Sequence, residues 1–129
     1  MLDKPPGDTL VEAVARLLRD EVLPALDGAL SFKVRVAANV LDLVQREMAG
    51  GARSDIEECA RLRALTGRDG ETDALNRVLC AGIRDGDISL ATPGLSDHLW
   101  ATTLAKMAIE QPGYASYRRI MGKRRQEQP

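Results

Sequence analysis

His98, Thr102 and Lys106 are residues whose types could do chemistry together. They follow one another at intervals of four, a spacing that places them along one face of a helix. An imidazole, a hydroxyl and an ammonium group aligned in this way could bind a phosphate or take part in proton transfer. The alternative, which the sequence favours, is a packed or solvated helix face, because no second histidine, acid or oxyanion-binding feature accompanies them.

Arg35 and Asn39 are a second polar pair, set in the apolar stretch "FKVRVAANVLDLVQREM". With Asp42 and Arg46 they lie along one helix face, at offsets of 4, 7 and 11 from Arg35. If a neighbouring helix covers Arg35, its guanidinium needs a carboxylate or carbonyl partner, because an unpaired buried charge is costly. We therefore expect Arg35 to pair across the bundle and Asn39 to bond a loop backbone. An anion-binding role for both residues is the alternative.

Most catalytic signatures are absent from the sequence. With one histidine, the chain cannot contain the two-histidine zinc motif H-E-x-x-H, and it has no phosphate-binding glycine loop or G-x-S-x-G elbow. Cys59 and Cys80 are too few for a disulfide framework and lack metal-ligand spacing. We therefore expect no catalytic residues, no metal and no cofactor.

The composition indicates a helical globular protein in the cytoplasm. Of the 129 residues, 44% are hydrophobic and 29% charged, while aromatic residues make up only 3%. The core must therefore be built mostly from Leu, Val and Ala, a composition typical of helical proteins. With a net charge of −1, the chain as a whole does not attract nucleic acid or acidic lipid electrostatically, so we expect neither as a partner. The start shows no basic region followed by an apolar run, so we expect no signal peptide, and no apolar run is long enough to span a membrane.

Apolar periodicity predicts an all-α, single-domain bundle of about five helices with a short C-terminal helix or tail. The domain is expected to cover residues 1–129, with a flexible leader over 1–7 and a flexible basic tail over 118–129. The expected helices cover residues 9–26, 31–48, 54–65, 72–85 and 92–110, and a last helix or tail follows from Tyr114.

Several packing predictions accompany this bundle. Gly50-Gly51 should end the second helix, which is apolar on most of its circumference and should have neighbours on two sides. Ile88 and Leu90 should pack back onto the core from their loop, and Trp100 should lie on the buried face of the fifth helix. Self-association through the second helix is an open alternative to its burial within one chain.

Four segments together resemble a small bacterial family of domains of unknown function: "EVLPAL", "FKVRVAANVLDLVQRE", "ALNRVLCAGIRDG" and "HLWATTLAKMAIEQPGY". The resemblance covers residues 10 to 114, and "RVAANVL" is its most specific piece. Members of that family are commonly encoded beside, or fused to, aminoglycoside-phosphotransferase-like kinases and acyl-CoA dehydrogenases. The resemblance implies an association with acyl-chain catabolism and gives no catalytic residue.

Two hypotheses for function follow. The first is a non-catalytic accessory or binding module for an acyl-CoA dehydrogenase or a phosphotransferase-like kinase. The second is a small enzyme or carrier that binds an acyl-CoA-like anion, with a pocket formed by the five candidate ligand-binding residues. These are Arg35, Asn39, His98, Thr102 and Lys106.

Overall fold

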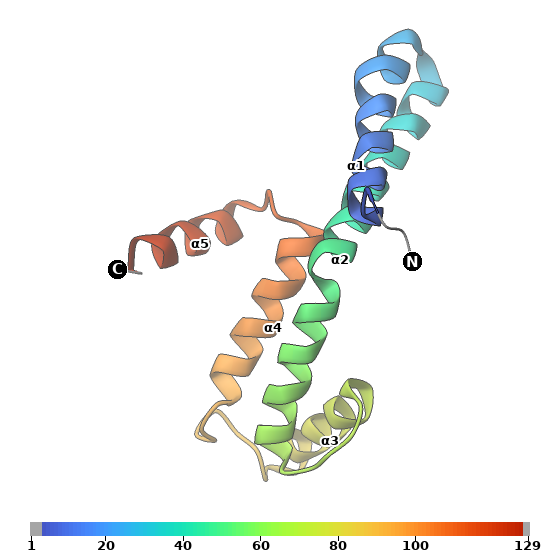
Figure 1. Ribbon diagram of the computed structural model, residues 1–129. Coiled ribbons are helices and arrows are strands. Elements are labelled where there is room, and N and C mark those ends of the chain that lie inside the picture. Colours follow the sequence, from blue (N-terminus) through green and yellow to red (C-terminus); the bar gives the residue numbers. More distant parts are fainter. Residues whose placement is uncertain (1–3, 128–129) are drawn as a thin grey trace. The chain divides into compact units, whose positions relative to one another are not determined.

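The computed structural model describes residues 4–127, which form helices and turns without any strand (Figure 1). The predicted all-α class is confirmed. Contacts divide the chain into an N-terminal unit, residues 1–52, and a C-terminal unit, residues 53–129. The expected single domain stays a prediction. The α-helices are α1 (Gly7–Leu17), α2 (Gly28–Thr66), α3 (Thr72–Asp85), α4 (Leu95–Glu110) and α5 (Ala115–Glu127).

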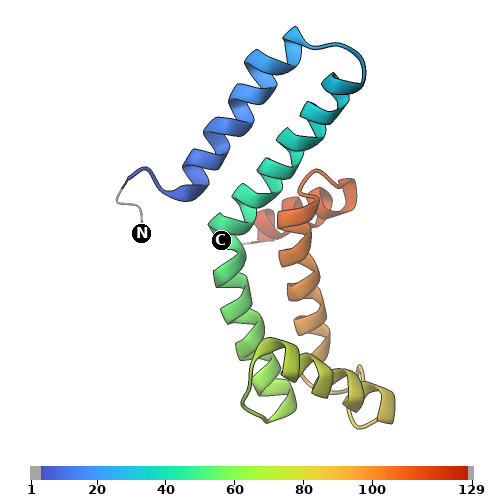
Figure 2. The same ribbon diagram turned by 90° about the vertical axis from the view of Figure 1, so that its right-hand side faces the viewer.

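The N-terminal unit is a hairpin of α1 and the first part of α2, which lie side by side (Figures 1 and 2). After α1 the chain forms a π-helical turn, η1 (Leu18–Val22), and a 3-10 turn, η2 (Leu23–Ala25). Pro24 explains this loosening, because it has no N–H to donate to the helical ladder. Among residues 4–52 the buried apolar side chains are the small ones of Ala15 and Ala38. The larger apolar side chains therefore remain partly or largely exposed.

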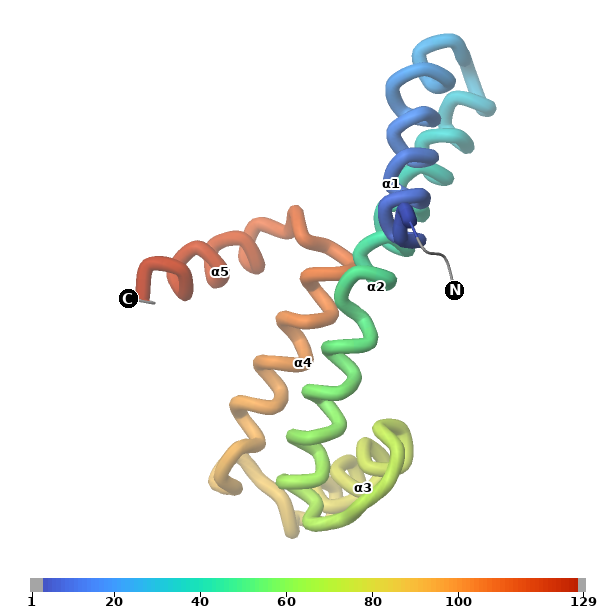
Figure 3. The backbone as a smooth tube through the Cα atoms, in the orientation of Figure 1, coloured from blue at the N-terminus to red at the C-terminus, as the bar shows by residue number. Residues whose placement is uncertain are grey.

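Helix α2 continues through Gly50-Gly51, so the predicted break there is wrong. The two helices expected over residues 31–48 and 54–65 are one helix of 39 residues, and the tube in Figure 3 keeps its helical turns through this stretch. Glycine lowers helix stability by only about 1 kcal/mol per residue, which flanking helix formers can offset. The boundary between the two units falls inside this helix.

The C-terminal unit holds the larger core. The buried leucines of this core come from three helices: Leu62 of α2, Leu75 and Leu79 of α3, and Leu95 of α4. Burying four leucines contributes roughly 6–12 kcal/mol before the entropy of ordering the chain is subtracted. Ile88 packs against this cluster from its loop, as predicted. Leu90, predicted to do the same, is 79% exposed.

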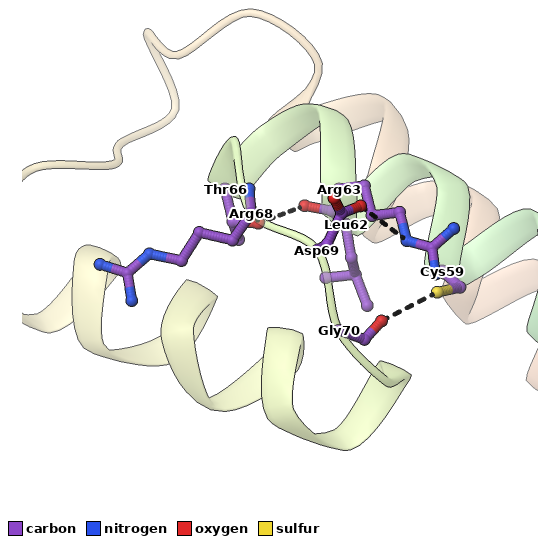
Figure 4. A network of polar contacts seen from close by, with 7 residues as sticks. All are labelled: Cys59, Leu62, Arg63, Thr66, Arg68, Asp69 and Gly70. Atoms are coloured by element: carbon purple, nitrogen blue, oxygen red, sulfur yellow. Dashed lines mark hydrogen bonds and ion pairs between the residues drawn. The ribbon is translucent and has the colours of Figure 1, made fainter.

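A compact turn joins α2 to α3 (Figure 4). Gly67 ends α2 with a φ of 65°, a left-handed conformation that favours glycine. The Thr66 hydroxyl donates to the carbonyl of Leu62 at 2.8 Å and accepts the N–H of Arg68 at 3.4 Å. The Cys59 thiol donates to the carbonyl of Gly70 at 3.6 Å. These bonds fix the angle at which α3 leaves α2.

Helix starts differ from the sequence prediction by a few residues. Helix α1 begins at Gly7 with Pro6 as its N-cap, two residues before the predicted start. Helix α4 begins at Leu95 with Gly94 as its N-cap, three residues after the predicted start. Thr92 instead closes the preceding loop, because its hydroxyl accepts the N–H of Ser89 at 3.0 Å. The first and last residues of the predicted flexible segments, 1–3 and 128–129, lie outside the described residues. Residues 115–127 form α5, and the flexibility predicted for the tail stays a prediction.

Candidate functional site

A polar cluster lies inside the C-terminal unit, where α2, α3 and α4 meet. We call it the buried polar cluster, and it comprises Glu58, Arg61, Asn76, His98 and Thr102. Arg61 donates from Nη2 to the Thr102 hydroxyl at 3.4 Å, and Asn76 donates from Nδ2 to Glu58 Oε1 at 3.2 Å. The cluster therefore ties the three helices together by polar contacts beside the leucine core.

His98 is the most buried member, with only 3% of its surface exposed. Burial lowers the pKa of the imidazole, the nearby Arg61 charge lowers it further, and the Glu58 charge opposes both. His98 is therefore neutral at pH 7. Its Nδ1 atom and the Arg61 Nε atom are buried without a hydrogen-bond partner.

The predicted row of His98, Thr102 and Lys106 does not face solvent as one surface. His98 is buried, and the Thr102 hydroxyl accepts a hydrogen bond from Arg61. Lys106, in contrast, is exposed. A proton-transfer group needs a substrate within hydrogen-bond reach, and the burial of His98 excludes bulk solvent from its ring. The burial of His98 suits a packed core histidine better than a catalytic base.

Arg35 and Asn39 belong to the N-terminal unit, and both are exposed. Within residues 4–127 Arg35 makes no ion pair, so the prediction that it pairs across the bundle is wrong. Asn39 Oδ1 accepts from Arg19 at 3.5 Å, and not from a loop backbone as predicted. The same arginine pairs with Asp42 at 2.7 Å. The physical reason is that α1 and η1 cover only one side of α2 within this unit.

The two predicted sets therefore lie in different units: Arg35 and Asn39 before residue 53, and His98, Thr102 and Lys106 after it. A single pocket formed by all five stays a prediction. Among residues 4–127 no group of three or more His, Cys, Asp or Glu side chains could hold a metal ion. Across the same residues no helix combines the length and apolarity that a membrane crossing requires.

An exposed apolar hollow lies on the outer side of α4, and we call it the Trp100 hollow. Its volume is about 300 Å³ and its lining residues are Leu90, Ser96, Leu99, Trp100 and Thr103. Trp100 is 52% exposed, so its predicted place in the core is wrong. The core side of α4 is occupied by Leu95, His98 and Leu104, and Trp100 follows His98 by two residues on a different face.

A second hollow lies between α5 and the turn before it, and we call it the basic hollow. It has a volume of about 450 Å³ and is lined by Pro112, Tyr117, Arg118, Met121, Gly122 and Arg125. Two guanidinium groups beside a phenol and a thioether can receive an anion that carries an apolar part. This hollow comes from the segment that the sequence predicted as a basic tail.

Comparison with protein families matches residues 24–114 to a domain of unknown function, DUF6285. This match covers most of the chain. The chain belongs to the DUF6285 family. Neither the curated proteins nor the solved structures contain a match. The predicted resemblance to a family of domains of unknown function is thereby confirmed, and the matched region extends from η2 to the turn before α5.

Sequence reasoning found two members of the buried polar cluster, His98 and Thr102, and missed the other three. Glu58 and Arg61 carry the contacts from α2. Both adjoin the apolar edge of that helix formed by Cys59, Leu62 and Leu65, a position from which long polar side chains can reach a neighbouring helix. Their place beside this edge is a signal that could have identified them.

Proposed function

We propose that this DUF6285 chain is a non-catalytic accessory module that binds a protein partner through the Trp100 hollow. The single observation that carries the proposal is the exposure of Trp100, at 52%, beside Leu99 and Leu90 in a shallow apolar hollow. Tryptophan is enriched among the residues that dominate binding energy at protein interfaces. The Ser96 and Thr103 hydroxyls in the lining can form hydrogen bonds with a partner, as polar groups do at such interfaces.

The alternative use of the fold as an enzyme has weaker support. The titratable group with catalytic potential, His98, is 3% exposed, and its pKa responds to the nearby charges of Arg61 and Glu58. Arg61 and Thr102 already contact one another, so the cluster has a structural role without any substrate. The exposed apolar surface has no such role within the C-terminal unit. Binding is therefore the function that the geometry supports best.

For the partner we propose an acyl-CoA dehydrogenase or a phosphotransferase-like kinase of acyl-chain catabolism. The class of partner rests on the resemblance described from the sequence, since the family itself is defined without a function. We place the module in the cytoplasm. Its two cysteines are free thiols, one of them exposed, which suits a reducing compartment.

The test is affinity purification of the tagged full chain from its native cell, with Trp100→Ala and Lys106→Ala as matched variants. Both residues lie on α4 and both are exposed, but Lys106 does not line the hollow. We expect stoichiometric recovery of a dehydrogenase or kinase of the stated classes. With the purified partner, Trp100→Ala should weaken binding by roughly 30-fold, the effect of losing a dominant interface residue.

Lys106→Ala should leave that affinity unchanged. The proposal is wrong if the recovered protein belongs to neither class. It is equally wrong if Trp100→Ala binds as tightly as the original chain, or if both variants lose binding to the same extent.

A second candidate function, a carrier for an acyl-CoA-like anion, is favoured by the basic hollow. Arg118 and Arg125 can pair with phosphate groups, while Tyr117 and Met121 offer apolar contact. The test is thermal stabilisation by acyl-CoA thioesters, with Arg118→Gln compared against Lys123→Gln, an exposed cation of α5 outside the lining. Stabilisation that Arg118→Gln removes and Lys123→Gln retains supports the carrier. Equal stabilisation of all three chains, or none, rejects the basic hollow as its site.

A further inference from the structure

Helix α2 carries an exposed ridge of five large apolar side chains spaced four residues apart. They are Phe32, Val36, Val40, Val44 and Met48, with 65%, 43%, 53%, 38% and 52% of their surfaces exposed. Isolated apolar residues on a surface are ordinary, but a continuous ridge marks an interaction surface. A ridge with this spacing is the one by which helices most commonly interdigitate in globular proteins.

The ridge lies on the side of α2 that α1 leaves uncovered. Ala15 and Ala38 are the buried apolar side chains of the hairpin. Val36 and Val40 stand two residues before and after Ala38, so they lie on the opposite side of α2 from it. The polar contact between Arg19 and Asp42 lies outside the ridge, which therefore presents an apolar face made by α2 alone.

From these features we infer that two copies of this chain associate through the exposed ridges of their α2 helices, which cross antiparallel about Val40. The ridge is symmetric about that residue, since two valines and then Phe32 and Met48 flank it at equal distances. A two-fold axis at Val40 sets Val36 against Val44 of the other copy and Phe32 against Met48. Such a self-complementary patch is what a two-fold interface requires.

Charge complementarity selects a second copy over an unrelated partner. Lys33 and Glu47 flank the ridge, each seven residues from Val40. Both are exposed, and neither makes an ion pair within residues 4–127. The antiparallel arrangement brings Lys33 of each copy opposite Glu47 of the other, so the symmetry produces two opposite-charge contacts at the rim. A parallel arrangement about the same ridge would set like charges against each other, which is unfavourable.

The available area agrees with a stable dimer. Complete burial of one such side chain removes roughly 60–120 Å² of apolar surface from water. The five ridge residues, with Leu30 and Leu43 on the same helix, are each close to half exposed and therefore offer roughly 200–400 Å² per copy on this scale. Interfaces are about 60% apolar, which gives roughly 350–700 Å² per copy in total. The upper part of this range reaches the ~600 Å² per copy at which stable interfaces begin.

The experiment is sedimentation velocity on the full chain over a concentration series, with variants that reverse the rim charges. We expect the original chain to sediment with twice the 14.0 kDa mass of one chain. Lys33→Glu and Glu47→Lys should each weaken the dimer by at least about tenfold, because each turns two attractive contacts into two repulsive ones. Combining both substitutions should restore the affinity of the original chain.

Val40→Glu should abolish the dimer by placing two carboxylates on the axis, whereas Arg35→Glu, outside the ridge, should leave it intact. Circular dichroism checks that every variant keeps its helix content. A chain that stays at the mass of one copy throughout the series overturns the inference. So does a dimer in which the doubly reversed chain is no tighter than the single variants, because that result contradicts the antiparallel pairing. Trp100 has no part in this interface, so failure here and failure of the partner proposal are distinguishable.

Discussion

Acidification should destabilise this protein through one residue, His98. It is the single histidine of the chain and is 3% exposed. Its pKa is lowered from the ordinary value, first by burial and then by the charge of Arg61, while Glu58 acts in the opposite direction. Below about pH 6.5 the unfolded chain takes up a proton on this imidazole that the folded chain resists.

The direction in which pH changes the free energy of unfolding follows from this difference in proton uptake. Above about pH 6.5 the imidazole is neutral in both states, and its contribution to stability is fully present. As the pH falls below that value, the free energy of unfolding decreases by at most about 1.4 kcal/mol per pH unit, the limit for one proton. The decrease stops at the lowered folded-state pKa, below which both states hold the proton.

The assay is urea unfolding of the original chain and of His98→Gln at a series of pH values between about 8 and about 5. Glutamine cannot titrate, so the difference between the two chains isolates the histidine from the carboxylates. We expect the stability of the original chain relative to His98→Gln to fall as the pH falls through this range. NMR titration of the single imidazole should give a midpoint below about 6.5. A midpoint at or above that value, or a pH-independent difference, would refute the reasoning.

Three further predictions test the fold. Leu62→Ala shortens a side chain with 0% exposure and should lower the free energy of unfolding in urea by about 2–5 kcal/mol. Ile56→Ala on the same helix, where the side chain is 72% exposed, should change it by less than about 0.5 kcal/mol. Equal effects would contradict the leucine core. Gly50→Ala adds a Cβ with nothing within 4 Å and should raise stability by about 0.5–1 kcal/mol; a loss would mean that α2 breaks there. Gly86→Ala forces alanine to a φ of 84° and should cost about 1–2 kcal/mol, seen as a lower midpoint on thermal melting; an unchanged midpoint would contradict that helix end.

Local sequence signals predicted the helices better than their junctions. Apolar periodicity identified the helical segments before residue 111 and left the last one, α5, open as a helix or a tail. Gly67 and Gly86 marked true helix ends because each adopts a left-handed conformation. Gly50-Gly51 looked the same in the sequence and yet lies inside α2. Whether a glycine ends a helix depends on where the next segment packs, and that information lies in tertiary contacts.

The candidate site was predictable only in part. The spacing of His98 and Thr102 identified one face of α4, but the contacts that occupy this face come from Arg61 and Glu58, about forty residues earlier. The second helix was predicted to need neighbours on two sides. Within its own unit it has one, and the side left over is the ridge about Val40. Periodicity reveals that a face is apolar, but it does not reveal whether the same chain covers it.

Trp100 gives the most direct measurement of the central claim, that this DUF6285 domain functions by binding a protein partner at the Trp100 hollow. It is the only tryptophan, so incorporation of 5-fluorotryptophan gives one ¹⁹F resonance from the hollow. We predict that titration with the purified partner shifts this resonance and removes its sensitivity to exchange of H₂O for D₂O, as burial of a half-exposed ring requires. A complex that forms while the resonance and its solvent sensitivity stay unchanged would contradict the account.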